Sequence, residues 1–153
     1  MNVKRAGLFG LAISLLLAGC GDDWGTDQHG ATVTAQQLDG QWLLINYWAE
    51  WCGPCRTEIP ELNELDQART DVTVLGVNFD GVQGEELLAA ANQLNINFKV
   101  LSVDPAERLG LPRSAVLPVT YIVDATGQVR DSLVGEQTAE GLLARLDKLR
   151  GEG

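Results

Sequence analysis

The sequence is poor in metal ligands and in basic residues. It has three cysteines and a single histidine among 153 residues, whereas a structural zinc site takes four Cys or His ligands. Basic residues number 11 against 21 acidic ones, which gives a formal net charge of −10. That balance argues against nucleic acid as a partner and is typical of a solvated acidic surface. The chain has no low-complexity tract or repeat, so one globular domain is expected.

A long apolar run is also missing. The most apolar stretch, residues 6–18, has 13 residues, whereas a helix needs about 20 to span a bilayer. It follows the basic pair Lys4 and Arg5 and ends in small residues before Cys20, which is the arrangement of a cleaved secretory signal. We therefore expect a signal peptide over residues 1–19, with an uncleaved transmembrane anchor as the weaker alternative.

The segment after the signal has little to bury. Residues 21–30 contain three glycines and three aspartates, a composition that favours a flexible chain. We therefore expect a tether over residues 20–30 and a folded domain over residues 31–153. The only histidine, His29, falls in this tether, where a solvated side chain without a catalytic role is expected.

The two other cysteines lie two residues apart, within the string WAEWCGPCRT at residues 48–57. An apolar run precedes them and a helical pattern follows. Cys52 is therefore expected at a helix start, where free backbone N–H groups and the helix dipole favour a thiolate. Cysteines in such motifs have pKa values of about 3.5 to 7.5, against about 8.5 for a free thiol. Cys55, nearly one turn further on, is positioned to resolve a mixed disulfide formed by Cys52. The spacing predicts a redox-active pair.

Three other interpretations of the pair are weaker. A structural zinc site would need further ligands that the sequence does not place nearby. An inert disulfide gains stability by closing a long loop, and the loop between Cys52 and Cys55 is short. A copper(I) carrier that uses both thiolates would be a metal-binding module instead of an enzyme, but its relatives usually add a histidine or a wider cysteine spacing. We expect no metal site and no cofactor.

Hydrophobic periodicity predicts alternating strands and helices. Strands are expected over residues 42–48, 72–79, 99–103, 119–123 and 128–134. Helices are expected from the cysteine pair to residue 68 with a kink at Pro60, over 85–94, near 106–109, and from Thr138 onward. The last two strands form a hairpin through a four-residue connection, residues 124–127. This order predicts an α/β fold whose mixed central sheet is covered by helices on both faces.

The element order and the string WAEWCGPC resemble the thioredoxin fold. A narrower resemblance is to the TlpA/ResA-type membrane-tethered thiol-disulfide oxidoreductases. It rests on residues 52–62 (CGPCRTEIPEL), on the additional strand and helix between residues 72 and 103, and on the exported N-terminus. The likeness covers about residues 32–150. It implies a thioredoxin-like domain with an extra strand–helix insertion.

The resemblance also implies roles for single residues. Cys52 would be the attacking thiol and Cys55 the buried resolving thiol, and the two would form the Cys52–Cys55 disulfide on oxidation. Pro118 falls where this fold places a cis-proline opposite the pair, and the backbone of Leu117 would offer strand-like hydrogen bonds to a bound peptide. Further substrate contacts are expected from Trp51, Gly53 and Pro54.

Glu58 lies three residues after Cys55, on the same helix face. In TlpA/ResA-type proteins the glutamate at this place tunes the thiols. The resemblance thus makes Glu58 a proton acceptor for Cys55 whose charge raises the thiol pKa values; the alternative is a solvated helix glutamate. Thioredoxins carry a buried aspartate six residues before the first cysteine. Asn46 occupies that position here and cannot hold a proton, so a hydrogen-bonded core group without a catalytic part is one interpretation of it.

Residues 17–20 (LAGC) resemble the bacterial lipobox, in which the cysteine is lipidated and becomes the new N-terminus. A lipid on Cys20 would leave Cys52 and Cys55 as an even pair in a compartment where disulfide chemistry is possible. The resemblance therefore implies a lipoprotein anchored to a membrane, in the periplasm or on the extracytoplasmic face. We expect it to be a monomer.

The expected enzyme is a protein-disulfide reductase. Its substrates would be disulfide-containing exported proteins, for example in cytochrome c maturation or periplasmic redox homeostasis, and a membrane thiol transporter would donate the electrons. The reduction potentials of proteins with such a cysteine pair range from about −270 mV for thioredoxin to about −120 mV for a strong oxidant. The Gly53–Pro54 dipeptide resembles that of the reducing proteins. The alternative is the same chemistry used as an oxidant or isomerase. A peroxidase does not fit, because Ala49 stands where peroxiredoxin-like sites carry Thr or Ser.

Overall fold

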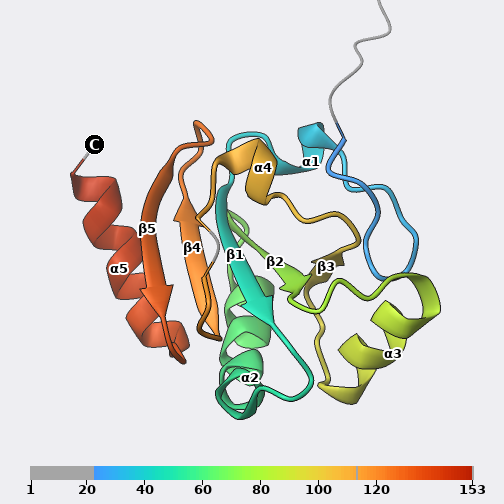
Figure 1. Cartoon of the computed structure of the whole chain (residues 1–153). Coiled ribbons are helices and arrows are strands. Elements are labelled where there is room, and N and C mark those ends of the chain that lie inside the picture. The colour runs from blue at the N-terminus through green and yellow to red at the C-terminus, as the bar shows by residue number, and fades with distance from the viewer. Residues whose placement is uncertain (1–22, 113, 153) are drawn as a thin grey trace, which may run out of the picture.

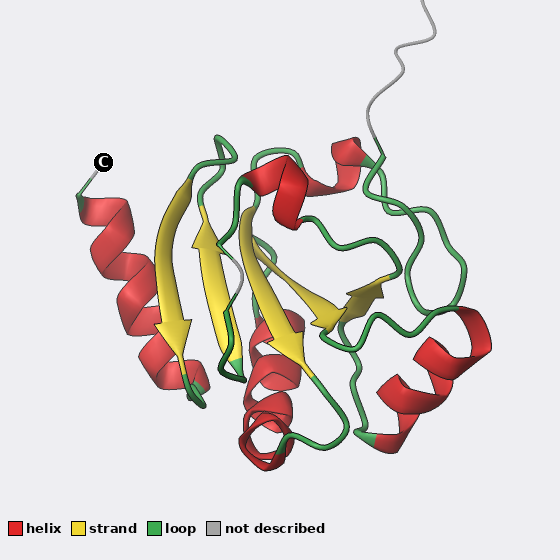
Figure 2. Cartoon of the chain, viewed as in Figure 1, coloured by secondary structure: helices red, strands yellow, loops and turns green. Residues whose placement is uncertain are grey.

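The computed structural model describes residues 23–112 and 114–152, so the expected signal peptide and Cys20 lie outside the described residues. Figures 1 and 2 show one sheet with helices on both sides. The helices are α1 (Ala35–Leu38), α2 (Gly53–Ala68), α3 (Gly84–Gln93), α4 (Ala106–Leu109) and α5 (Ala139–Gly151). The strands are β1 (Trp42–Trp48), β2 (Val72–Asn78), β3 (Lys99–Leu101), β4 (Val119–Val123) and β5 (Val129–Val134). Within the described part, no helix is both long and apolar enough to cross a bilayer.

The sheet is mixed, with strand order β3-β2-β1-β4-β5. β1 lies in the middle, parallel to β2 and antiparallel to β4, as its almost continuous apolar sequence predicts. In this register Asn46 of β1 lies opposite Gly76 on one side and Thr120 on the other. A Cβ at Gly76 would lie 3.0 Å from the Trp48 indole nitrogen, so the glycine leaves room for this large side chain just before the cysteine pair.

Each face of the sheet carries its own hydrophobic core. Leu44, Trp48 and Ile122 point toward α2, α3 and α5 and form the larger core. Ile45, Leu75 and their neighbours form the smaller core with α1 and α4 on the opposite face. The alternation follows from the strand period of two residues. The predicted α/β fold, with a mixed sheet covered on both faces, is confirmed.

The N-terminal segment differs from the expectation. Residues 20–30 were expected to form a flexible tether, but from Asp23 onward the chain packs along the edge strand β3. The buried Gln28 amide acts like a strand backbone, since its Nε2 donates to the Phe98 carbonyl (3.1 Å) and its Oε1 accepts from the Val100 N–H (2.7 Å). An exposed strand edge is a template for unwanted pairing, and this segment covers it. Composition alone did not show that one glutamine side chain would pair with a strand.

Element boundaries shift by a few residues. β3 ends at Leu101 because the next N–H, that of Ser102, donates to the Thr26 carbonyl (2.8 Å) of the N-terminal segment. The hairpin connection has five residues, 124–128, instead of four, because β5 begins at Val129. The α2 helix continues through Pro60 to its predicted end, and Thr138 caps α5 as predicted by accepting the Gly141 N–H.

Candidate active site

The cysteine pair lies where the central strand passes into the first long helix. Cys52 is the N-cap residue of α2, and its Sγ accepts a hydrogen bond from the Cys55 N–H (3.2 Å). Pro54 stands in the first turn, where a missing N–H costs nothing. Cys52 and Cys55 are joined in a disulfide. Cys52 is 4% exposed and Cys55 is fully buried, so Cys52 is the cysteine of the pair that is nearer to solvent.

The rim of the site is formed by exposed side chains around Cys52. Trp51 is 65% exposed, and its indole N–H donates to the Asp80 carboxylate (2.9 Å) while its ring meets Phe79 edge-on. Gly53 and Pro54 are exposed beside it. The three expected substrate contacts on this side are thus accessible. Phe79 and Asp80 extend the rim, although sequence reasoning placed Phe79 inside a buried strand.

A second segment brings Pro118 to the start of β4. The Leu117–Pro118 peptide bond is cis; Pro118 is buried and Leu117 is half-buried. Next to Leu117 lies a cleft of about 270 Å³, whose lining includes two tyrosines and one carboxylate: Tyr47, Phe79, Asp104, Leu117 and Tyr121. Sequence reasoning missed this cleft, because its walls come from β1, β4 and three loops that are distant along the chain.

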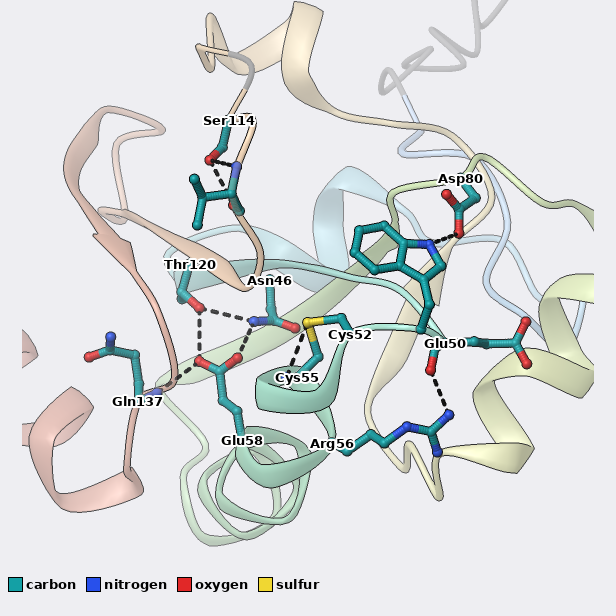
Figure 3. Close-up of a disulfide and its surroundings, with 12 residues drawn as sticks. Asn46, Glu50, Cys52, Cys55, Arg56, Glu58, Asp80, Ser114, Thr120 and Gln137 are labelled. Carbon is teal, nitrogen blue, oxygen red and sulfur yellow. Dashed lines mark hydrogen bonds between the residues drawn. A yellow bond between two sulfur atoms is a disulfide. The ribbon is translucent and has the colours of Figure 1, made fainter.

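Glu58 lies behind the disulfide and is buried, with 1% of its surface exposed. Its Oε2 accepts from Asn46 Nδ2 (2.9 Å), and its Oε1 accepts from the Thr120 hydroxyl (3.4 Å) and the Gln137 N–H (3.3 Å) (Figure 3). Burial raises the pKa of Glu58 to about 7; the nearby Glu136 carboxylate adds to the rise, and the three hydrogen bonds oppose it. A solvated helix glutamate, the alternative weighed from the sequence, does not fit this burial.

Asn46 lies between Glu58 and the cysteines. Its side chain is fully buried, and its Nδ2 donates to Thr120 Oγ1 (3.0 Å) as well as to Glu58. Its Oδ1 has no hydrogen-bond partner among the described residues. The partners Thr120 and Gln137 were not singled out from the sequence. The only signal for Thr120 was its place two residues after Pro118, on the face of β4 that turns toward α2.

The site combines a buried disulfide at a helix N-terminus, a cis X-Pro bond and a mixed sheet. Together these features define a thioredoxin-fold redox protein. The chain belongs to the AhpC/TSA family, whose model matches residues 20–132. It is 30% identical over 127 residues to the thiol-disulfide oxidoreductase ResA of Bacillus cereus, covering 81% of this chain and 72% of that protein.

A further relative agrees with this assignment, and a solved structure agrees with the fold. The thiol:disulfide interchange protein HelX of Rhodobacter capsulatus is 32% identical over 118 residues, which are 75% of this chain and 64% of HelX. The crystal structure of a DsbF homologue from Corynebacterium diphtheriae has the same fold, with a TM-score of 0.69 at 23% identity, over 81% of this chain and 82% of that one. The predicted fold family and thiol-disulfide oxidoreductase activity are confirmed.

Proposed function

We propose that this enzyme reduces disulfides in exported proteins. The observation that carries the proposal is the unequal exposure of the two cysteines, since Cys52 is 4% exposed and Cys55 is fully buried. Cys52 Sγ also lies within hydrogen-bond distance of a helix N-terminal N–H, an environment that favours its thiolate. A substrate disulfide would therefore first contact the activated sulfur of Cys52, while the buried Cys55 takes part only in the second step.

The reaction follows from this order of burial. The Cys52 thiolate attacks a substrate disulfide, one substrate sulfur leaves as a thiolate, and a mixed disulfide forms. Cys55 then loses its proton and attacks Cys52 Sγ, which releases the second substrate thiol and leaves the Cys52–Cys55 disulfide. The substrate gains two electrons and the enzyme loses two. A donor dithiol returns the pair to its reduced form by the same exchange.

Glu58 supports the second step in this proposal. It is the buried carboxyl on the Cys55 side of α2, and with a pKa of about 7 it changes protonation near neutral pH. We assign it the role of accepting the Cys55 proton, while its negative charge raises the thiol pKa values by repulsion of a thiolate. Pro118 and Leu117 would hold the substrate chain across the site, and Trp51 with Gly53 and Pro54 would line its other side.

The redox potential tests the direction of electron flow. Equilibration of the protein with a thiol-disulfide buffer should give a potential well below −150 mV, toward the value of about −270 mV of thioredoxin. The fraction of oxidised protein can be read by alkylation and mass shift. A potential above about −150 mV would make the protein an oxidant or isomerase of protein disulfides.

The anchor is a separate part of the proposal. The LAGC string at residues 17–20 supports a lipid on Cys20, which would hold the domain at the outer face of a membrane near a thiol donor in that membrane. Cys20→Ser should move the protein from the membrane fraction to the soluble exported fraction and abolish labelling by a fatty acid analogue. Cys55→Ser is the matched control and should remain in the membrane fraction. Unchanged fractionation and labelling of Cys20→Ser would contradict the anchor.

A further inference from the structure

Asn46, Glu58, Thr120 and Gln137 form a hydrogen-bonded network behind the sheet surface. In this network the Asn46 amide has a buried oxygen without a hydrogen-bond partner among the described residues. Both of its N–H groups are engaged, by Glu58 (2.9 Å) and Thr120 (3.0 Å), whereas Oδ1 is buried without a partner among the described residues. A buried acceptor left without a hydrogen bond costs about 1–3 kcal/mol. Native proteins rarely keep such a group without a reason.

The orientation of this amide follows from its partners. The Glu58 carboxylate, when ionised, can only accept hydrogen bonds, so the nitrogen of Asn46 must face it and the oxygen must face away. Figure 3 shows the oxygen pointing toward the disulfide. Leu44 and Trp48, the neighbours of Asn46 on the same face of β1, pack in one core with Cys52 and Cys55. The free oxygen is therefore directed at the redox centre.

The disulfide has no hydrogen to donate, but the reduced pair does. When a donor dithiol reduces the site, the S–S bond breaks, two electrons pass to the two sulfurs, and each sulfur takes up a proton when the thiols are neutral; the donor becomes a disulfide. The proton on Cys55 Sγ then lies in a buried place. The new S–H therefore forms on the side of the sheet that already carries the unpaired Asn46 oxygen.

We propose that Asn46 is a positioning residue whose amide oxygen accepts the Cys55 S–H in the reduced protein, while its amide nitrogen keeps hold of Glu58. The amide thereby links the resolving thiol to the buried carboxyl, whose hydrogen bonds among the described residues come from Asn46, Thr120 and Gln137. It also favours the dithiol over the disulfide, because its oxygen is satisfied only after reduction. The inference rests on the proposed function only in requiring that the pair cycles between these two states.

The test is the S–H stretching band of the reduced protein at pH 8, where Glu58, with a pKa of about 7, is ionised and can only accept hydrogen bonds. The band that is missing in Cys55→Ser is assigned to Cys55. In Asn46→Leu this band should move to higher frequency, because the thiol loses its acceptor. Asn46→Asp keeps an oxygen at the same place and should retain the lower frequency. Thr120→Val removes a hydroxyl that faces the amide nitrogen and should also leave the band in place.

A second measurement covers the case in which Asn46→Leu folds poorly. Loss of one hydrogen bond should shift the equilibrium constant with glutathione about fivefold toward the oxidised protein in Asn46→Leu, and less in Asn46→Asp. A merely structural role would destabilise both redox forms alike and leave this constant unchanged. An unchanged Cys55 band or an unchanged constant in Asn46→Leu, or a shifted band in Asn46→Asp, would overturn the role. Failure of the proposed reductase function would show separately, in the wild-type potential.

Discussion

Cells that produce the Cys55→Ser variant should accumulate mixed disulfides between Cys52 and exported proteins. In the wild type Cys55 attacks the mixed disulfide from within the same helix turn, and such positioned reactions have effective molarities of about 10⁵ M or more. Removing Cys55 leaves only external thiols at millimolar concentration, so the lifetime of the complex should rise at least about 10³-fold. Non-reducing gels followed by mass spectrometry would identify the trapped substrates.

Cys52→Ser is the matched control for this trapping experiment. It leaves Cys55 as the only thiol of the pair, and Cys55 is fully buried, so few or no mixed disulfides should form. The order of the two sulfurs in the reaction would be contradicted if Cys52→Ser trapped partners and Cys55→Ser did not. The class of the trapped proteins would also show whether exported disulfide proteins are the substrates.

Glu58→Gln should make the stability of the oxidised protein depend less on pH. The pKa of Glu58 is raised from 4.5 to about 7 in the folded protein, first of all by burial. Between these values the folded state holds a proton that the unfolded state has released, so the free energy of unfolding falls as pH rises. The difference between the two pKa values corresponds to a loss of roughly 3 kcal/mol from pH 4 to pH 8.

Urea unfolding of the disulfide form at several pH values measures this effect. The difference in unfolding free energy between wild type and Glu58→Gln should change by roughly 3 kcal/mol from pH 4 to pH 8. The other carboxyl groups are common to both proteins and cancel in this difference. Glu64→Gln, which removes an exposed carboxylate of the same helix, should follow the wild-type curve. Parallel curves for wild type and Glu58→Gln would contradict a carboxyl that titrates near neutral pH.

In the reduced protein, Glu58→Gln should lower the pKa of both thiols.

The sequence predicted most of the fold because its signals are local. The apolar run of β1, the helical spacing after the cysteines and the Thr138 cap each depend on residues a few positions apart, and β1 and β4 have the predicted bounds. The N-terminal segment was predicted differently, because its order depends on Gln28 pairing with Phe98 and Val100. These contacts join residues about 70 positions apart, and composition contains no trace of them.

The same distinction applies to the site. Cys52, Cys55 and Glu58 lie within seven residues of one helix, so spacing places all three on the correct side. Thr120 and Gln137 reach Glu58 from β4 and from the loop before α5, 62 and 79 residues away. Their approach depends on strand register and on how α5 packs against α2. The burial that raises the pKa of Glu58 is likewise a property of the assembled core.

If Cys20 carries the proposed lipid, the packing of the N-terminal segment onto β3 limits how far the redox centre can stand from the membrane. Asp23 is the first residue that the structure describes, and it lies three residue steps after Cys20, so a lipid on Cys20 would be within at most about 11 Å of it along the chain. In Figure 1 the blue start of the described chain lies at the top, whereas the arrowhead of β1, which leads to the cysteine pair, points to the bottom. An anchored domain would hold its dithiol on the side away from the lipid, where soluble exported proteins can reach it. A thiol donor in the membrane would then have to extend a thiol-bearing part past the full height of the domain to reduce the Cys52–Cys55 disulfide.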